Sequence, residues 1–313
     1  MGCCEDIFSD VYACFAYKMT LVRRPELIYT LLASRTSVPI GQGNQYTTRL
    51  FHDKPAADIP LPGCCETPPP CPTKWTDTTF STQEYGCWEP ICLIKEIHKR
   101  NPDLNERAIL SGRQMKDTED SLSLKILNSA IAVINGTHGE NGDRPTEPTE
   151  ADIKEIEELL DENNAIYVFD RLEARNLIGT CPQSEAYIGV GQRKIASSFE
   201  AIKGFTEKKC YPSQNCLLRS EKGIVSHTRF FFSNRGIVEE KASAKGRNVY
   251  TVFIGGLAAM SIADLQGYPP IFKYLPPNDR MERCANTYWK INWGGVLNPE
   301  QHVYKYRVTE RVA

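Results

Sequence analysis

The sequence has no long apolar run. None of its 313 residues lies in a stretch approaching the roughly 18 consecutive apolar residues that a membrane helix requires. The N-terminus also lacks the basic and then apolar layout of a secretory signal peptide. We therefore expect a soluble protein without a membrane partner, long enough to bury a sizeable core in one large domain or two ordinary ones.

Excess charge and the motifs of common enzymes are also lacking. The chain has 37 basic and 39 acidic residues, and this near balance excludes tight, sequence-independent binding of duplex DNA as its main activity. The zinc-protease motif HExxH, the nucleophile elbow GxSxG and the phosphate-binding P-loop are absent, and the 5 histidines lie in separate segments. We therefore expect no catalytic residues, no cofactor, no metal site and no enzymatic activity.

Cysteine is plentiful, but it lacks the spacing of a functional site. No two of the 12 cysteines are separated by the two residues that zinc ribbons and thioredoxin-like redox sites require. Cys14, Cys92 and Cys284 stand among aromatic or aliphatic neighbours, so we expect them to be small apolar core residues. A disulfide framework would require that the protein leaves a reducing cytosol.

A proline-rich segment separates two predicted strands. Residues 46–51 and 75–88 have strand character, and 7 prolines lie between them. Proline removes a backbone donor and fixes φ, so this excursion is neither a helix nor a central strand. A long hairpin with few apolar residues at its tip cannot bury itself. It is therefore either a disordered surface loop or a segment that lies on another surface, and composition alone leaves both readings open.

The other segments predict helices first and a mixed α and β half afterwards. Two short helices are expected within residues 1–36, and one long helix of about 50 Å over residues 102–134, ending at Asn135-Gly136. The polar face of this long helix is expected to be an exposed surface that carries Arg107, Arg113, Lys116, Asp117, Glu119 and Asp120. Further on, Thr149 with Asp152 predicts a capped helix, residues 195–203 predict another, and strands are expected at residues 167–169, 186–190, 228–232 and 249–254.

Charge is unevenly arranged in this second half. Residues 139–175 hold 12 acidic and 4 basic side chains, whereas residues 193–247 hold 5 acidic and 12 basic ones. Such opposed regions either pair within one subunit or favour head-to-tail contacts of the kind that closes into rings.

Several fragments, taken in their order along the chain, are similar to one known family. They are Arg35-Thr36-Ser37-Val38-Pro39-Ile40-Gly41-Gln42-Gly43-Asn44, Arg49 with Pro60-Leu61, Glu84-Tyr85-Gly86, Asn101-Pro102-Asp103-Leu104-Asn105-Glu106, Glu221-Lys222-Gly223-Ile224-Val225 with Arg229-Phe230, Tyr250 to Ala259, and Tyr288-Trp289-Lys290 through Val296-Leu297. Together they resemble the coat protein family of N-four-like tailed phages, which is built on the Hong Kong 97-type major capsid fold.

The resemblance implies an α+β fold in five parts. These are an N-terminal arm (1–46), an extended loop hairpin (47–86), a peripheral domain with a long spine helix (87–146), a mixed axial domain (147–287) and a return to the peripheral domain (288–313). It also implies a major capsid protein that assembles into hexamers and pentamers in the host cytoplasm and forms the icosahedral head shell of the virion. Its implied partners are other copies of itself, scaffold, cement and portal proteins, and packaged double-stranded DNA, bound non-specifically.

Two sets of candidate residues follow from this resemblance. Contacts between the extended loop and a neighbouring subunit are assigned to Arg49, Pro60, Leu61 and Trp75. Disulfides between subunits are assigned to Cys3, Cys4, Cys64, Cys65 and Cys71, with the alternative that these thiols stay reduced and only pack. Two other functions remain open, namely another virion structural or decoration protein and a cysteine-dependent redox or metal enzyme.

Overall fold

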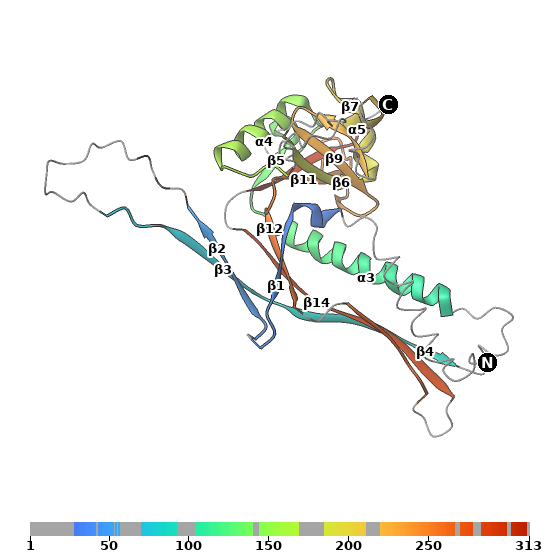
Figure 1. Cartoon of the computed structure of the whole chain (residues 1–313). Helices are drawn as coiled ribbons and strands as arrows, with labels where there is room; N and C mark the ends of the chain where they lie inside the picture. The colour runs from blue at the N-terminus through green and yellow to red at the C-terminus, as the bar shows by residue number, and fades with distance from the viewer. Residues whose placement is uncertain are drawn as a thin grey trace, which may run out of the picture.

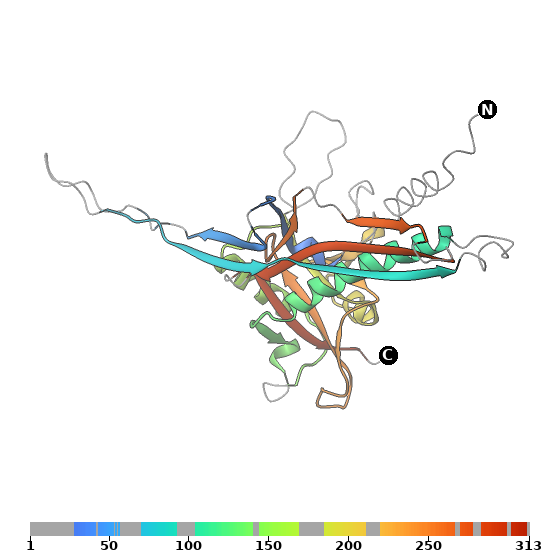
Figure 2. The same ribbon diagram turned by 90° about the horizontal axis from the view of Figure 1, so that it is seen from below.

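The computed structural model describes residues 28–41, 43–52, 54, 56, 70–92, 104–139, 144–168, 185–210, 220–266, 270–277, 283–298 and 302–311. Two sheets and one long helix make up the body, and a two-stranded hairpin projects away from it (Figures 1 and 2). The chain is therefore α+β, as expected. Within the described residues, no helix is long and apolar enough to cross a membrane.

The larger sheet has eight strands in the order β5-β15-β11-β6-β9-β8-β7, and β10 pairs with β11. Their bounds are β5 Val133–Asn135, β6 Tyr187–Gln192, β7 Thr206–Glu207, β8 Glu221–Val225, β9 Thr228–Ser233, β10 Ile237–Glu239, β11 Val249–Gly255 and β15 Val303–Thr309. All seven residues of β11 are buried, because both faces of the sheet are covered. A strand covered on both sides has a continuous apolar sequence, and this made β6, β9 and β11 predictable.

One face of this sheet is covered by the helices α4 (Glu150–Glu162) and α5 (Ala196–Glu200). Ile153, Ile156 and Leu160 of α4 join Phe199 of α5 in an apolar cluster with the side chains on that face. The predicted cap of α4 is confirmed, since the Asp152 backbone N–H donates to Thr149 Oγ1 at 3.3 Å.

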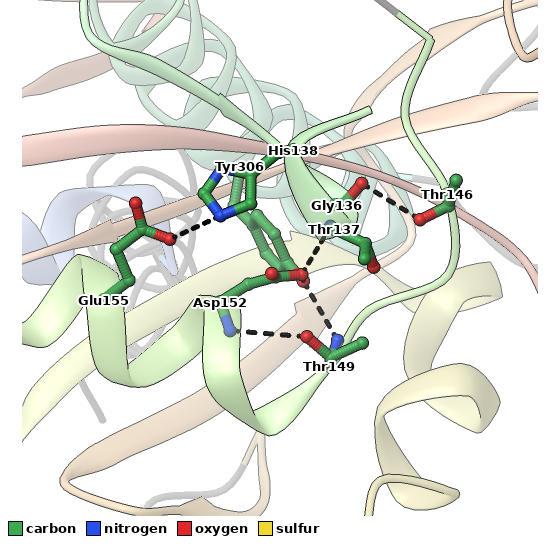
Figure 3. Close-up of polar contacts among 8 residues, drawn as sticks. All are labelled: Gly136, Thr137, His138, Thr146, Thr149, Asp152, Glu155 and Tyr306. Atoms are coloured by element: carbon green, nitrogen blue, oxygen red, sulfur yellow. Dashed lines mark hydrogen bonds and ion pairs between the residues drawn. The ribbon is translucent and has the colours of Figure 1, made fainter. Parts of the chain in front are cut away.

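Buried carboxylates fix α4 to its surroundings. Asp152 Oδ2 accepts hydrogen bonds from the Thr137 N–H and the Tyr306 hydroxyl of β15, both at 2.7 Å (Figure 3). One turn further on, Glu157 Oε1 accepts from the His227 N–H at 2.9 Å and the Thr228 hydroxyl at 2.6 Å, at the turn between β8 and β9. Both acids thus place α4 on the sheet through charge-assisted hydrogen bonds.

The smaller sheet is built around the long strand β14 (Cys284–Leu297). Its strands run in the order β1-β12-β14-β13, and β4 pairs with β14; the bounds are β1 Ala33–Val38, β4 Gln83–Cys92, β12 Met260–Leu265 and β13 Ile271–Leu275. Alternate residues of β14 are buried, including Trp289, Ile291 and Trp293, so one face of this sheet belongs to the core.

Helix α3 (Leu104–Leu127) packs on the buried face of β14, and the Trp289 indole N–H donates to Gln114 Oε1 at 3.0 Å. The 3-10 helix η1 (Tyr29–Leu32) lies against α3: the Tyr29 N–H donates to Asp120 Oδ1 at 3.2 Å. The Tyr29 hydroxyl donates to the Arg235 carbonyl at 2.7 Å, which joins η1 to the larger sheet as well. Burial raises the pKa of the Asp120 carboxyl in this position. Three further 3-10 helices are η2 Gly136–His138, η3 Arg193–Ile195 and η4 Lys208–Cys210.

The long helix is shorter than predicted. It has 24 residues, about 36 Å, and it does not continue to residue 134. Residues 133–135 instead form β5, which pairs in parallel with β15, so Asn135-Gly136 is a strand end and not a helix end. Ile and Val fit this strand because β-branched side chains favour extended backbone.

Several burial predictions are wrong. Glu119 and Asp120 were assigned to the exposed face of α3, but they are buried, at 3% and 7% exposure, because η1 and β1 cover that part of the helix. Cys284 is exposed and Cys92 is partly exposed, so neither is a core residue. Residues 167 and 168 form no strand, and only η1 represents the predicted second helix within the described part of residues 1–36.

Candidate subunit-contact hairpin

The projecting hairpin consists of β2 (Gln45–Phe51) and β3 (Trp75–Ser81). The strands are antiparallel and in register, with Gln45 opposite Ser81 and Phe51 opposite Trp75. They form a separate two-stranded sheet, and Figures 1 and 2 show it extending well beyond the body. A two-stranded ribbon alone is marginally stable in water, so its side chains decide what it does.

Strand alternation gives the hairpin two unlike faces. One face is half-buried along the ribbon and carries Tyr46, Thr48, Leu50, Thr76, Thr78 and Phe80. The other is exposed and carries Gln45, Thr47, Arg49, Phe51, Trp75, Asp77, Thr79 and Ser81. The half-buried face contains the Tyr46–Phe80 ring pair, with centroids 5.6 Å apart. The exposed face therefore offers its charged and aromatic groups to the surroundings.

Arg49 organises the exposed face. Its Nε and Nη2 atoms donate to the two carboxylate oxygens of Asp77 at 2.7 and 2.8 Å, in a bidentate pair. The guanidinium carbon also lies 5.0 Å from the centroid of the Trp75 ring, within cation–π distance. The hydrogen bond to Asp77 raises the pKa of Arg49, and the same bond holds the pKa of Asp77 below its ordinary value.

Phe51 extends this cluster towards the tip. Its ring meets Trp75 edge to face, with centroids 6.5 Å apart. Phe51 is 61% exposed and Trp75 is 51% exposed, whereas Phe253 and Tyr306 in the body are completely buried. An aromatic pair held in place on a projecting ribbon is typical of a surface that another molecule covers.

The structure brings together two of the four predicted loop-contact residues, Arg49 and Trp75. It adds Phe51 and Asp77, which the sequence analysis missed. Residues two apart in a strand lie on the same face, so the predicted strand already places Phe51 on the face of Arg49. This alternation could have identified Phe51 from the sequence. Asp77 needed the hairpin register, which the sequence does not reveal.

The other predicted residues are less informative. Pro60, Leu61, Cys3, Cys4, Cys64 and Cys65 lie outside the described residues. Cys71 is exposed beside the hairpin, and its carbonyl accepts from Lys54 Nζ at 3.2 Å. The described cysteines are not joined by disulfides.

One group of described residues has the composition of a metal site. Ligand atoms of His138, Asp152 and Glu155 lie within 4.8 Å of one another (Figure 3). Asp152 Oδ2 already accepts two hydrogen bonds, and His138 Nε2 lies 3.4 Å from Glu155 Oε2. These contacts account for the arrangement as the anchor of α4, so the hairpin remains the candidate functional surface.

Comparisons with known proteins were made by sequence and by structure. No family model and no curated protein matches the sequence. Among solved structures, the capsid of Ralstonia phage GP4 is similar with a TM-score of 0.68 and 11% identity, covering 90% of this chain and 88% of that one. The capsid of cyanophage Pam1 gives a TM-score of 0.63 at 11% identity, covering 91% and 93%. The head of Helicobacter pylori bacteriophage KHP40 gives 0.63 at 10% identity, covering 90% and 87%. The chain therefore has the Hong Kong 97-type fold of phage capsid proteins.

Proposed function

We propose that this protein is a major capsid protein of a tailed phage, acting through assembly and not through catalysis. The supporting observation is the hairpin: within a capsid-type fold, a ribbon that contributes to none of the three apolar clusters of the described residues exposes a fixed aromatic and charged face. In a lone subunit the apolar surface of the ribbon stays in contact with water and adds nothing to stability. Burial of this surface against a neighbouring subunit would supply the stabilising free energy that a two-stranded ribbon lacks by itself.

In this proposal the hairpin of each subunit lies across its neighbour, and subunits close into hexamers and pentamers of an icosahedral shell. The smaller sheet with α3 would form the peripheral domain, and the larger sheet with α4 and α5 would form the axial domain around each capsomer. The bounds expected from the sequence do not follow this division, because β12 and β13, within residues 147–287, lie in the smaller sheet, and β15, within residues 288–313, lies in the larger one. The arm, residues 1–46, enters the body through β1, which pairs in parallel with β12. Many weak contacts repeated around the shell then act together.

The partners of the shell belong to the same proposal. The net charge of −2 suits weak, non-specific contact with packaged double-stranded DNA, because strong binding needs a basic surface. Scaffold, cement and portal proteins complete the set. The site of action is the virion, after assembly in the host cytoplasm.

Sedimentation and electron microscopy of the purified full-length chain test the proposal. The expected result is rings of five or six subunits, or closed shells, above a threshold protein concentration. A decoration protein would bind preformed shells without forming them alone. A stable monomer at every concentration tested would refute self-assembly.

A further inference from the structure

Two cysteines face each other across the ribbon formed by β4 and β14. Cys92, the last residue of β4, lies directly opposite Cys284, the first residue of β14. The pairing continues without a register shift to Gln83 and Trp293, so the two strands run antiparallel along ten residue pairs. Cys284 is exposed and Cys92 is partly exposed, which leaves this end of the ribbon accessible to small molecules.

Both thiols belong to the same face of the ribbon. Residues directly opposite in an antiparallel pair point to the same side, and β14 alternates between Cys284 on the outer face and buried Ala285 on the inner face. The outer face also carries the next pair in phase, Pro90 opposite Asn286. The sulfur atoms are therefore not separated by the sheet.

Pro90 indicates which kind of pair the cysteines form. An antiparallel ladder alternates between hydrogen-bonded and non-hydrogen-bonded pairs, and a hydrogen-bonded pair needs an N–H from each residue. Proline has none, so Pro90 and Asn286 fit the non-hydrogen-bonded kind. The pair Cys92–Cys284 lies two positions further along the ladder, so it is also a non-hydrogen-bonded pair. In such a pair the two Cα atoms are about 4.5 Å apart, within the roughly 4.4–6.8 Å that disulfides span.

We propose that Cys92 and Cys284 form a disulfide within one subunit when the protein meets a low-molecular-weight disulfide such as oxidised glutathione. One thiolate attacks the glutathione disulfide and releases one glutathione thiolate. The other cysteine thiolate then attacks the mixed disulfide and releases the second. One disulfide is reduced to two thiols while one is formed, and the two cysteine protons end on the released glutathione.

The link closes the open end of the ribbon. β4 ends at Cys92 and β14 begins at Cys284, and these two residues are far apart in the sequence, so no hairpin turn joins the two strands at this end. A covalent bond at this point fixes the register of all ten pairs and closes a long loop of chain, which restricts the unfolded state. The link does not depend on assembly, so it stands or falls separately from the proposed function.

Peptide mapping of the wild-type full-length protein provides the first test. After incubation with oxidised glutathione, remaining thiols are alkylated and the tryptic peptides are analysed by mass spectrometry. Cys284 begins its own tryptic peptide after Arg283, whereas Cys87 and Cys92 share one. Cys87 lies opposite Trp289, so C87S is the matched control that assigns the link to Cys92.

The expected result is one linked peptide pair, from a monomer band on non-reducing electrophoresis, in both the wild type and C87S. It is absent in C92S and C284S. Oxidation should raise the melting temperature of the wild type and C87S by about 4–8 °C, and that of C92S not at all. Complete alkylation of both cysteines in the wild type, or a link of Cys284 to any other cysteine or to a second subunit, overturns the proposal.

Discussion

Replacing Trp75 by alanine should strongly raise the protein concentration needed for assembly without unfolding the subunit. Trp75 belongs to the exposed face of the hairpin and is 51% exposed, so the subunit alone gains little from its ring. The melting temperature of the unassembled protein should therefore change little. In the shell, a neighbour would cover the ring, and the variant would lose that contact in every subunit.

The size of the loss follows from the exposed area. A tryptophan side chain of about 250 Å² that is half exposed leaves roughly 125 Å² to be buried, worth about 3 kcal/mol at 25 cal/mol per Å². A loss of this size weakens a contact roughly 150-fold. Because each subunit contributes one hairpin, the threshold concentration for assembly should rise by about the same factor.

Light scattering against protein concentration measures this threshold, and electron microscopy identifies the particles. Trp75→Phe keeps an aromatic ring and should recover most of the assembly. Thr79→Ala alters an exposed position on the same face without removing a ring, and it serves as the matched control. If Trp75→Ala assembles at the wild-type threshold, the hairpin face is not a contact surface.

Three further predictions concern the body. Glu157→Ala should destabilise the fold by about 1–3 kcal/mol in urea unfolding, because the buried Thr228 hydroxyl and the part-buried His227 N–H lose their acceptor. The matched change at the exposed neighbour, Glu158→Ala, should cost less than about 0.5 kcal/mol. Gly86→Ala should cost about 1–3 kcal/mol, since its Cβ would lie 2.5 Å from the Trp289 carbonyl oxygen; an unchanged melting curve would contradict this close approach. Burial and the neighbouring Asp152 raise the pKa of the Tyr306 hydroxyl, so as the pH rises the unfolded chain loses the hydroxyl proton before the folded chain does. The contribution of Tyr306 to the free energy of unfolding is therefore complete below about pH 10 and declines above it by up to about 1.4 kcal/mol per pH unit. Tyr306→Phe should lack that part of the alkaline slope.

Local patterns predicted the elements that depend on neighbouring residues. The strand β2, the cap of α4 and the buried strands β9 and β11 follow from alternation, a capping pair and continuous apolar runs. The end of α3 could not be predicted in this way, because residues 133–135 form a strand that pairs with β15, about 170 residues later, and do not extend the helix. Such long-range pairing overrides helical periodicity and leaves no local signal.

The site was predictable only in part for the same reason. The resemblance drew attention to Arg49, and strand alternation could have added Phe51. The partnership of Arg49 with Asp77 depends on the hairpin register across an excursion of more than twenty residues, which turn chemistry does not fix at that length. Cys92 and Cys284 show this more clearly: their local neighbours suggested core residues, and only pairing across the chain placed them opposite each other on an accessible face.

The hairpin cluster makes sense as preparation for contact. An exposed ion pair such as Arg49–Asp77 adds little to the stability of a subunit, and a two-stranded ribbon adds little either. What the pair does is hold the guanidinium over the Trp75 ring while Phe51 meets the ring edge. Fixing a large side chain before association avoids about 0.5–1.5 kcal/mol of ordering cost at the moment of contact. In the proposed shell this saving would be repeated in every subunit, and it would favour one geometry of the hairpin and one way of joining neighbours.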